Sequence, residues 1–294
     1  MLSEELLKKV RLIEITTRKM VDEVMSGQYR SHFKGHGVQF SEHRIYVAGD
    51  DVRHIDWKVS ARTRDLLVKK FEEERELSVF IVVDASGSKK FGTYEKFKSE
   101  IAAELSAMLA YAATHTGDRV GVLIFSDQVE KIIPPKKGRQ HILRIIKDLL
   151  TFKPQASGTD LANALEATGR VMKHSGIVFI ISDFLTEGYD VALKKLARKH
   201  DVVAIKLFDE REEEIPALGP VLFVDPETQV ERFVDTSSYS FRKWFDEFRT
   251  ALKTDTESAL KGSQVETLKI VTKEDYGEAV VRFFRARSRR KKRT

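Results

Sequence analysis

Long apolar runs and helix-like patterns alternate along the middle of the chain. Four runs rich in β-branched residues predict strands at 77–83, 120–125, 177–182 and 202–208. Between them, apolar residues recur at three- and four-residue spacing and predict helices at 94–115, 139–150 and 160–172. Strands that alternate with helices imply right-handed crossovers and a mostly parallel sheet covered on both faces. The pattern therefore predicts an α/β fold.

The flanking regions follow other patterns. A helix is expected at 1–26, followed at 29–76 by a segment too polar to form its own core, with β-like pieces at 38–47 and 66–71. We expect this polar segment to pack on the sheet. Later in the chain we expect a short edge strand at 129–133, a hairpin at 221–224 and 230–234, and a helix at 239–260.

These patterns divide the chain into four segments. The first is an N-terminal helix with the polar segment, at 1–76, and the second is the α/β domain at 77–235. A C-terminal helical extension at 236–284 and a basic tail at 285–294 complete the chain.

Composition narrows the class of protein. The chain has 294 residues, of which 41% are hydrophobic, and this is enough for an ordered globular core. Cysteine is absent, so the fold uses neither disulfides nor thiolate ligands, and we expect a cytoplasmic location. No run approaches the roughly 20 apolar residues of a membrane span, so we expect no membrane span.

The net charge of +6 is concentrated at one end. The segment 285–294 holds seven basic residues and no acidic residue, so the rest of the chain is nearly neutral. Such a tail is usually a solvated, disordered end. The alternative is that it binds nucleic acid or another anionic surface.

Oxygen-bearing side chains follow the strand expected at 77–83. Asp84, Ser86 and Ser88 lie within five residues, and Gly87 allows a tight turn. Hard oxygen donors at the carboxyl edge of a parallel sheet suit Mg²⁺ or Mn²⁺, and open α/β sheets bind ligands in that crevice. An aspartate after a buried strand also occurs in phosphatases and phosphoacceptor domains, so this cluster alone leaves these classes open.

Two more oxygen clusters are expected at the same edge. Residues 157–160 precede a predicted helix, and Asp183 follows the strand at 177–182. Each of these residues alone could be a helix cap or part of a solvated turn. The full set resembles the metal-ion-dependent adhesion site of the von Willebrand factor type A domain: Asp84, Ser86, Ser88, Thr159 and Asp183.

This resemblance implies roles for the five residues. The two serines and the threonine would bind the cation directly, and the aspartates would act mostly through bound water. Hydroxyls are weak neutral donors, so the ion would keep an open position that accepts a carboxylate from a partner protein.

The polar segment carries a second resemblance. Its motifs are Phe33-Lys-Gly35-His-Gly37, Phe40-x-Glu42-x-Arg44-x-Tyr46, Gly49-Asp-Asp-x-Arg-x-Ile-Asp-Trp57, Ala61-Arg62-Thr63 and Val68-Lys69-x-Phe71-Glu72-Glu73. They are similar to the signature of a bacterial family known as domain of unknown function 58, whose members join this segment to a type A domain. Family members are typically encoded beside MoxR-type AAA+ ATPases. The resemblance therefore implies an adaptor between such an ATPase and an unidentified client protein.

The charged residues of this signature have two interpretations. Six charged residues could anchor loops to the α/β domain through charge-assisted hydrogen bonds, with Trp57 as a packing anchor: Asp50, Asp51, Arg53, Asp56, Arg62 and Arg64. They could instead form a recognition surface for the ATPase or the client. We expect no zinc site, because the histidines of this segment lack tight ligand spacing: His32, His36, His43 and His54.

Catalysis is not expected. Haloacid-dehalogenase-like phosphatases need a second acid two residues after the nucleophile, and Ser86 stands at that position. Receiver domains need an acidic pair after an earlier apolar strand, whereas Asp50 and Asp51 lie in a polar segment. No phosphate-binding loop or nucleophile elbow is present. We therefore expect a non-enzymatic, cation-dependent interaction module, with tail-mediated binding to nucleic acid or an Asp84-dependent phosphatase as alternatives.

Overall fold

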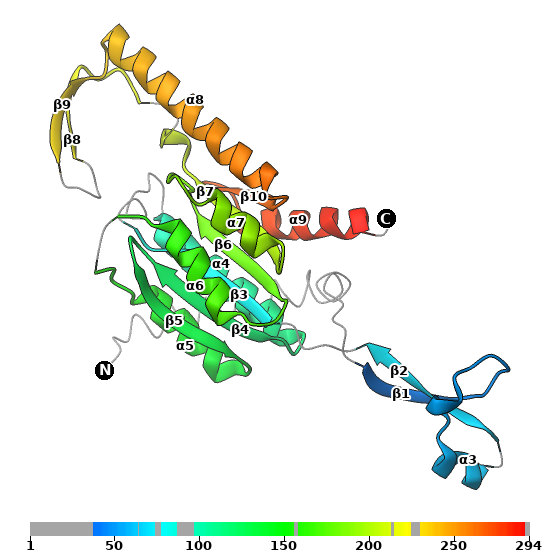
Figure 1. Cartoon of the computed structure of the whole chain (residues 1–294). Coiled ribbons are helices and arrows are strands. Elements are labelled where there is room, and N and C mark those ends of the chain that lie inside the picture. The colour runs from blue at the N-terminus through cyan, green and yellow to red at the C-terminus, as the bar shows by residue number, and fades with distance from the viewer. Residues whose placement is uncertain are drawn as a thin grey trace.

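A six-stranded sheet forms the centre of the molecule. The computed structural model describes residues 38–63, 65–73, 78–86, 97–155, 158–212, 215–224 and 230–291. The strands lie in the order β10-β7-β6-β3-β4-β5, and every pair is parallel except β4 with β5 (Figure 1). Their bounds are β3 (Ser78–Asp84), β4 (Arg119–Phe125), β5 (Val129–Lys136), β6 (Ile177–Ser182), β7 (Asp201–Phe208) and β10 (Glu266–Val271). The α/β fold predicted from the sequence is confirmed.

The chain reverses its direction of travel across the sheet between β3 and β6. From β3 it proceeds outward to β4 and β5, and it then returns to the other side for β6, β7 and β10. The two central strands are parallel neighbours, with Val83 opposite Ile181, so their carboxyl ends lie side by side. In open α/β sheets the helices diverge at such a reversal and leave a crevice that binds ligands.

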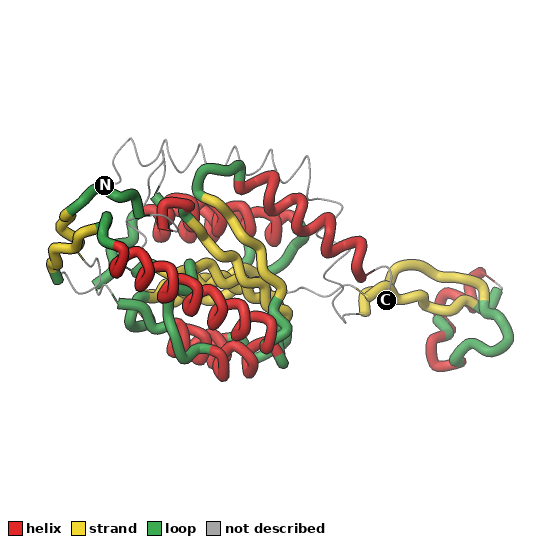
Figure 2. The backbone as a smooth tube through the Cα atoms, turned by 90° about the horizontal axis from the view of Figure 1, so that it is seen from above, coloured by secondary structure: helices red, strands yellow, loops and turns green. Residues whose placement is uncertain are grey.

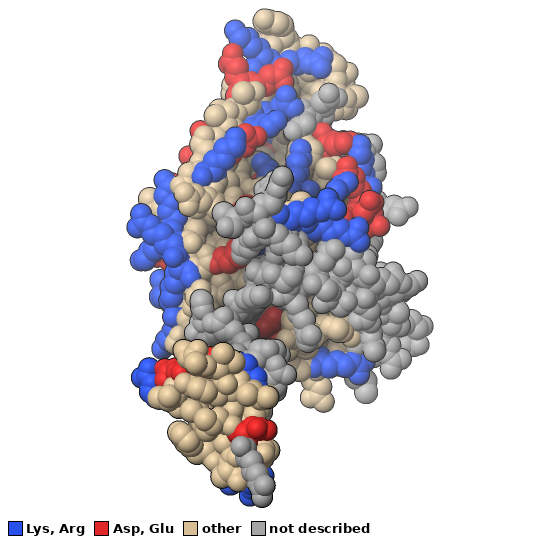
Figure 3. All heavy atoms as spheres, turned by 90° about the vertical axis from the view of Figure 1, so that its right-hand side faces the viewer, with Lys and Arg blue, Asp and Glu red and all other residues tan. Residues whose placement is uncertain are grey.

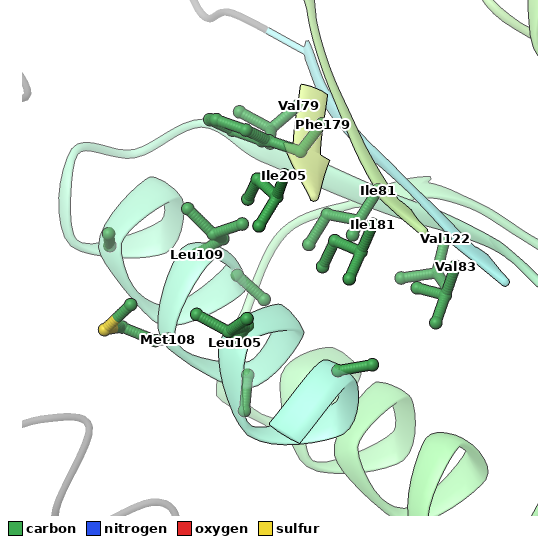
Figure 4. Close-up of a cluster of buried hydrophobic side chains, with 14 of the residues drawn as sticks. Val79, Ile81, Val83, Leu105, Met108, Leu109, Val122, Phe179, Ile181 and Ile205 are labelled. Atoms are coloured by element: carbon green, nitrogen blue, oxygen red, sulfur yellow. The ribbon is translucent and has the colours of Figure 1, made fainter. Parts of the chain in front are cut away.

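The inner strands β3, β4, β6 and β7 are buried on both faces because helices cover each face of the sheet (Figure 2). Along β3, Val79, Ile81 and Val83 point to a core shared with α4 (Lys98–His115), α5 (Arg139–Leu150) and α9 (Tyr276–Lys291) (Figure 4). The alternate residues, Phe80 and Val82, point to a second core that includes side chains of α6 (Leu161–Val171), α7 (Asp190–Ala197) and α8 (Tyr239–Gly262). Successive side chains of a strand point to opposite faces, and here both faces are buried. The sequence of each inner strand is therefore a continuous apolar run.

The signature segment forms a small unit of its own. β1 (Val38–Ile45) pairs antiparallel with β2 (Leu67–Glu73), and α3 (Trp57–Thr63) lies between them in the chain. The two β-like pieces expected from the sequence are thus strands. Figures 1 and 2 show this unit beside the α/β body and not across a face of the sheet, where we expected it to pack. The helix expected at 1–26 lies outside the described residues.

A second projection consists of a hairpin and the first half of α8. The predicted hairpin is formed by β8 (Pro220–Val224) and β9 (Glu231–Asp235), and Figure 1 shows it beside the N-terminal half of α8. Aromatic rings connect the two, because Phe223 of β8 lies 6.2 Å from Phe241 of α8 between ring centroids. Within α8, Trp244 stacks on Phe248 at 5.4 Å between ring centroids. We call this projection, residues 220–224 and 230–250, the aromatic arm.

The C-terminal part of the chain differs from the expected division. β10 joins the main sheet, so the α/β unit extends past the expected boundary at 235. Leu268 and Ile270 face the core while Lys269 is exposed. This alternation is typical of an edge strand, but it is too short for the sequence alone to predict a strand. α9 continues to Lys291, so most of the expected tail is helical.

The basic tail is also not wholly solvated. Arg287 is buried, and its guanidinium forms ion pairs with Asp201 and with Glu266, the latter at 2.6 Å. Asp201 and Glu266 are the first residues of β7 and β10. The ion pairs of Arg287 therefore hold α9 against the amino ends of these two strands. Only the tertiary fold brings these three residues together.

Buried His200 makes the stability of the fold depend on pH. It is 4% exposed, and neither ring nitrogen has a hydrogen-bond partner among the described residues. Burial, with a smaller contribution from Lys199, lowers its pKa from 6.5 to about 4. Between these values the unfolded chain binds a proton that the folded chain does not, so stability falls as the pH drops from 6.5 to about 4. His200→Phe should remove up to about 3 kcal/mol of this loss.

Denaturant unfolding of both proteins at several pH values between 4.5 and 7.5 provides the measurement. Other titrating groups contribute equally to the two proteins, so the difference between the curves isolates His200. Parallel curves would show that His200 does not contribute to the acid lability.

Candidate functional site

Asp84 is a buried carboxylate at the reversal point of the sheet. It is the last residue of β3 and is 1% exposed. Its Oδ1 accepts a hydrogen bond from the Ser86 N–H at 3.0 Å, and its Oδ2 accepts one from the Ser182 hydroxyl at 2.6 Å. The turn after β3 therefore holds one oxygen, and the neighbouring strand β6 holds the other.

The turn after β6 places the second carboxylate. Asp183 is 3% exposed, and its Oδ1 accepts a hydrogen bond from the Leu185 N–H at 3.3 Å. The next residue, Phe184, is fully buried and has a φ of 59°, a left-handed conformation that bulky residues rarely adopt. Contacts hold this conformation: the Ser182 hydroxyl accepts from the Phe184 N–H at 3.0 Å, and the Thr256 hydroxyl donates to the Phe184 carbonyl at 3.3 Å.

The loop before α6 places Thr159 beside this turn. The Thr186 hydroxyl donates to the Thr159 carbonyl at 3.3 Å. Asp160 caps α6 by accepting from the Asn163 N–H at 2.9 Å, and its own N–H bonds the Ser126 carbonyl at the end of β4. Thr159 is thus held between the ends of two strands.

The structure brings four of the five predicted residues to one edge of the sheet. Asp84 and Ser86 follow β3, Asp183 follows β6, and Thr159 lies against the turn that contains Asp183. Ser88 lies outside the described residues.

Sequence reasoning missed two charged residues at this site. Lys98, the first residue of α4, is fully buried, and its ammonium lies 3.6 Å from Oδ2 of Asp183. The same ammonium donates a hydrogen bond to Glu212, in the short 3₁₀ helix Glu210–Glu212 that follows β7. A lysine and a glutamate at element ends ordinarily face solvent, and no local pattern distinguishes these two.

A further lysine lies close by on β7. Lys206 stands opposite Ser182 in the register of the sheet. Burial lowers its pKa, and the carboxylate of Asp183 opposes part of that shift. Asp183 thus lies in the field of two ammonium groups.

The donor set fits a small divalent cation. Two buried carboxylates favour positive charge beside them, and the side chains of Ser86 and Thr159 offer hydroxyl oxygens at the same edge. The described residues contain no group of three or more His, Cys, Asp or Glu side chains able to hold a metal. Any cation bound here would therefore depend on the hydroxyls as well as on the carboxylates.

The charged residues of the signature segment pair within their own unit. Arg44 bonds both carboxylate oxygens of Asp50, at 2.7 and 2.6 Å, and Arg53 bonds Asp51 at 2.8 Å. The Arg44 guanidinium lowers the pKa of Asp50, as Arg53 lowers that of Asp51. These contacts shape the loop between β1 and α3 and do not reach the sheet.

Trp57 is not the packing anchor that we expected. Its side chain is 65% exposed in the described structure. Other exposed apolar side chains lie on either side of Trp57 in the sequence: Ile45, Val47, Val52 and Leu66. Figure 3 shows this unit with few charged groups on the visible face. The unit therefore presents an apolar surface supported by internal ion pairs.

Comparison with known proteins places the chain in a family. The profile described as "Protein of unknown function DUF58" matches residues 42–255, and the chain belongs to this family. Uncharacterized protein Rv1480 of Mycobacterium tuberculosis is 32% identical over 283 residues, which cover 95% of this chain and 89% of that protein. Uncharacterized protein YeaD of Bacillus subtilis is 25% identical over 144 residues, covering 49% of this chain and 34% of that protein.

Solved structures are similar to this chain at low sequence identity. The conserved hypothetical protein BatB from Bacteroides thetaiotaomicron has a TM-score of 0.49 and 14% identity, and the match covers 72% of this chain and 99% of BatB. The SpRpn10 VWA domain has a TM-score of 0.39 and 10% identity, with 70% of this chain and 94% of that domain covered. Within the described part of the chain, no helix has the length and apolar character needed to cross a membrane.

Removing the Ser182 hydroxyl should weaken the fold through Asp84. Ser182→Ala deletes the 2.6 Å hydrogen bond to Asp84 and the 3.0 Å hydrogen bond from the Phe184 N–H. It leaves a buried carboxylate oxygen with one donor fewer, so we expect a loss of at least about 1–3 kcal/mol in unfolding free energy. Urea unfolding provides the measurement, and Ser240→Ala, on the exposed face of α8, is the control.

A double-mutant cycle with Asp84→Asn separates the contact from general packing effects. If the hydrogen bond matters, the two substitutions together should cost clearly less than the sum of the two alone. Additive costs would contradict the importance of this bond.

Proposed function

We propose that this chain is a cytoplasmic, non-enzymatic, divalent-cation-dependent protein-interaction module. We further propose that it acts as an adaptor between a MoxR-type AAA+ ATPase and a client protein. The observation that carries the cation dependence is the pair of buried carboxylates, Asp84 and Asp183, at the reversal point of the sheet. Membership of the DUF58 family and the α/β fold support the broader assignment as an interaction module.

The chain's own residues would hold the cation in an asymmetric set. Asp84 is oriented from two sides, by the Ser86 N–H and the Ser182 hydroxyl, and Asp183 by the Leu185 N–H. Ser86, Ser88 and Thr159 would supply hydroxyl oxygens, which donate little charge to the metal. A bound Mg²⁺ or Mn²⁺ would retain an electrophilic position suited to a carboxylate of a partner protein.

Exposed aromatic side chains support a role in protein binding. On the aromatic arm, Phe233 is 80% exposed, Tyr239 82% and Trp244 55%. Trp57 adds an exposed ring on the signature unit at another place in the molecule. Large apolar groups gathered on exposed surfaces are typical of protein interaction sites. An adaptor needs separate surfaces for its two partners, and these projections lie apart in Figure 1.

Divalent cations should stabilise the wild-type protein. We expect 10 mM Mg²⁺ or Mn²⁺ to raise the Tm by about 2–5 °C, because a ligand that binds only the folded state shifts unfolding by mass action. Asp84→Ala should abolish this shift, whereas Asp246→Ala, on the exposed face of α8, should preserve it. Differential scanning calorimetry measures the shift. Titration calorimetry that detects no cation binding to well-folded wild type would refute the cation dependence.

Partner capture should depend on the same site. In a pull-down from lysate of the source cell, wild type should retain the ATPase or client, and both Asp84→Ala and an added chelator should reduce the recovered partner at least about tenfold, which is about 1.4 kcal/mol. A chain truncated after Arg287 tests the tail-mediated alternative, because it keeps the ion pairs of Arg287 and removes the basic residues beyond it. Loss of the partner on truncation, with retention in Asp84→Ala, would contradict the adaptor hypothesis.

A further inference from the structure

Lys98 occupies a position that a lysine rarely takes. Its side chain is fully buried, and it lies at the start of α4, at the edge of the sheet that carries Asp84 and Asp183. Removing an ammonium from water is costly, so a buried lysine requires carboxylate partners. Lys98 has two of them, Asp183 and Glu212, on turns that follow two different strands.

The two contacts of Lys98 are unequal. The ammonium donates a hydrogen bond to Glu212, whereas Oδ2 of Asp183 is 3.6 Å away, which is an ion-pair distance but too long for a hydrogen bond. Glu212 is also more accessible, with 23% of its side chain exposed against 4% for Asp183. The ammonium is thus bonded to the carboxylate at the rim, while its charge compensates the carboxylate inside the site.

We propose that Lys98 competes with a divalent cation for Asp183, and that Glu212 keeps the ammonium when the cation binds. This inference rests on the proposed cation site and extends it to the charge that regulates the site. A divalent ion and an ammonium within a few ångströms of one carboxylate repel each other, and outside bulk water this repulsion is large. Lys98 therefore weakens cation binding, and Glu212 limits the penalty by holding the ammonium away from the ion.

Removing Lys98 has different consequences for a competing ammonium and for a purely structural ion pair. A structural pair would lose stability on removal, with cation affinity unchanged or reduced. A competing ammonium would give a gain in affinity on removal. The affinity itself, measured apart from stability, distinguishes the two.

The test is titration calorimetry of Mn²⁺ into the full chain, for wild type and for the double variant Lys98→Met/Glu212→Gln. The double variant removes both charges of the pair, so the net charge near the site is unchanged. Of the remaining carboxylates in the described structure, only Asp183 loses its contact with the ammonium of Lys98, and that loss is the effect under test. We expect Mn²⁺ to bind the double variant about tenfold more tightly, or tighter still. The matched control is Lys273→Met/Glu210→Gln, which removes an exposed ion pair that involves the same 3₁₀ turn, and it should leave the affinity unchanged.

Each outcome decides between the hypotheses. Tighter Mn²⁺ binding by the double variant than by wild type supports the role of Lys98. Mn²⁺ binding by the double variant alone also supports that role, but it contradicts the cation dependence of the wild-type protein. Equal or weaker binding in the double variant overturns the role of Lys98 and leaves the cation site standing. Absence of Mn²⁺ binding in both overturns both.

A single variant covers the case in which the double variant does not fold. Glu212→Gln leaves Lys98 in place without its hydrogen-bonded carboxylate, so the ammonium should move closer to Asp183 and Mn²⁺ affinity should fall. Glu210→Gln removes the same charge from the same turn but affects the partner of Lys273 instead. An equal effect of the two substitutions on Mn²⁺ affinity would contradict the role of Lys98. Circular dichroism confirms that each protein is folded.

Discussion

The hydrogen bond between the Ser182 hydroxyl and Oδ2 of Asp84 joins the two central strands at the reversal point of the sheet. A carboxylate that is 1% exposed has lost its water, so it needs hydrogen-bond donors or a cation beside it. β3 and β6 supply donors because they are parallel neighbours whose carboxyl ends meet. The turn that contains Asp183 follows β6 directly, and Thr159 lies against that turn. The geometry of this edge therefore depends on the hydrogen bonds that hold the buried Asp84.

The same constraint explains why charges of both signs gather at this edge. Asp183 stands near Lys98 and Lys206, and Lys98 is shared with Glu212. Buried charges that compensate each other add little net stability compared with apolar packing, but the removal of one partner is costly. Such an arrangement suits a site that exchanges one positive charge for another. The rigid sheet behind it, apolar on both faces, would keep the carboxylates in place during the exchange that we propose.

The projections follow a different physical logic from the sheet. In the signature unit, short ion pairs such as Arg44 with Asp50 fix the backbone of a loop and leave Trp57 exposed. In the aromatic arm, stacked rings support one another along α8, and part of each ring still faces solvent. Both projections maintain exposed apolar surface by local contacts, which is an arrangement suited to binding other proteins. The α/β body carries the charged site, and the projections carry the apolar surfaces.

The sequence alone determined the elements whose periodicity is strong. The bounds expected for α5 and β6 agree with the structure, because an amphipathic helix and a doubly buried strand each leave an unmistakable local pattern. The placement of Asp84 and Asp183 at one edge was predictable because the carboxyl ends of parallel strands share an edge of the sheet. Only the tertiary structure decided that β10 completes the sheet, that Arg287 and Lys98 turn inward, and that Trp57 faces solvent. These outcomes depend on partners distant in the chain, since the burial of a charged side chain is settled by the carboxylates that the fold brings beside it.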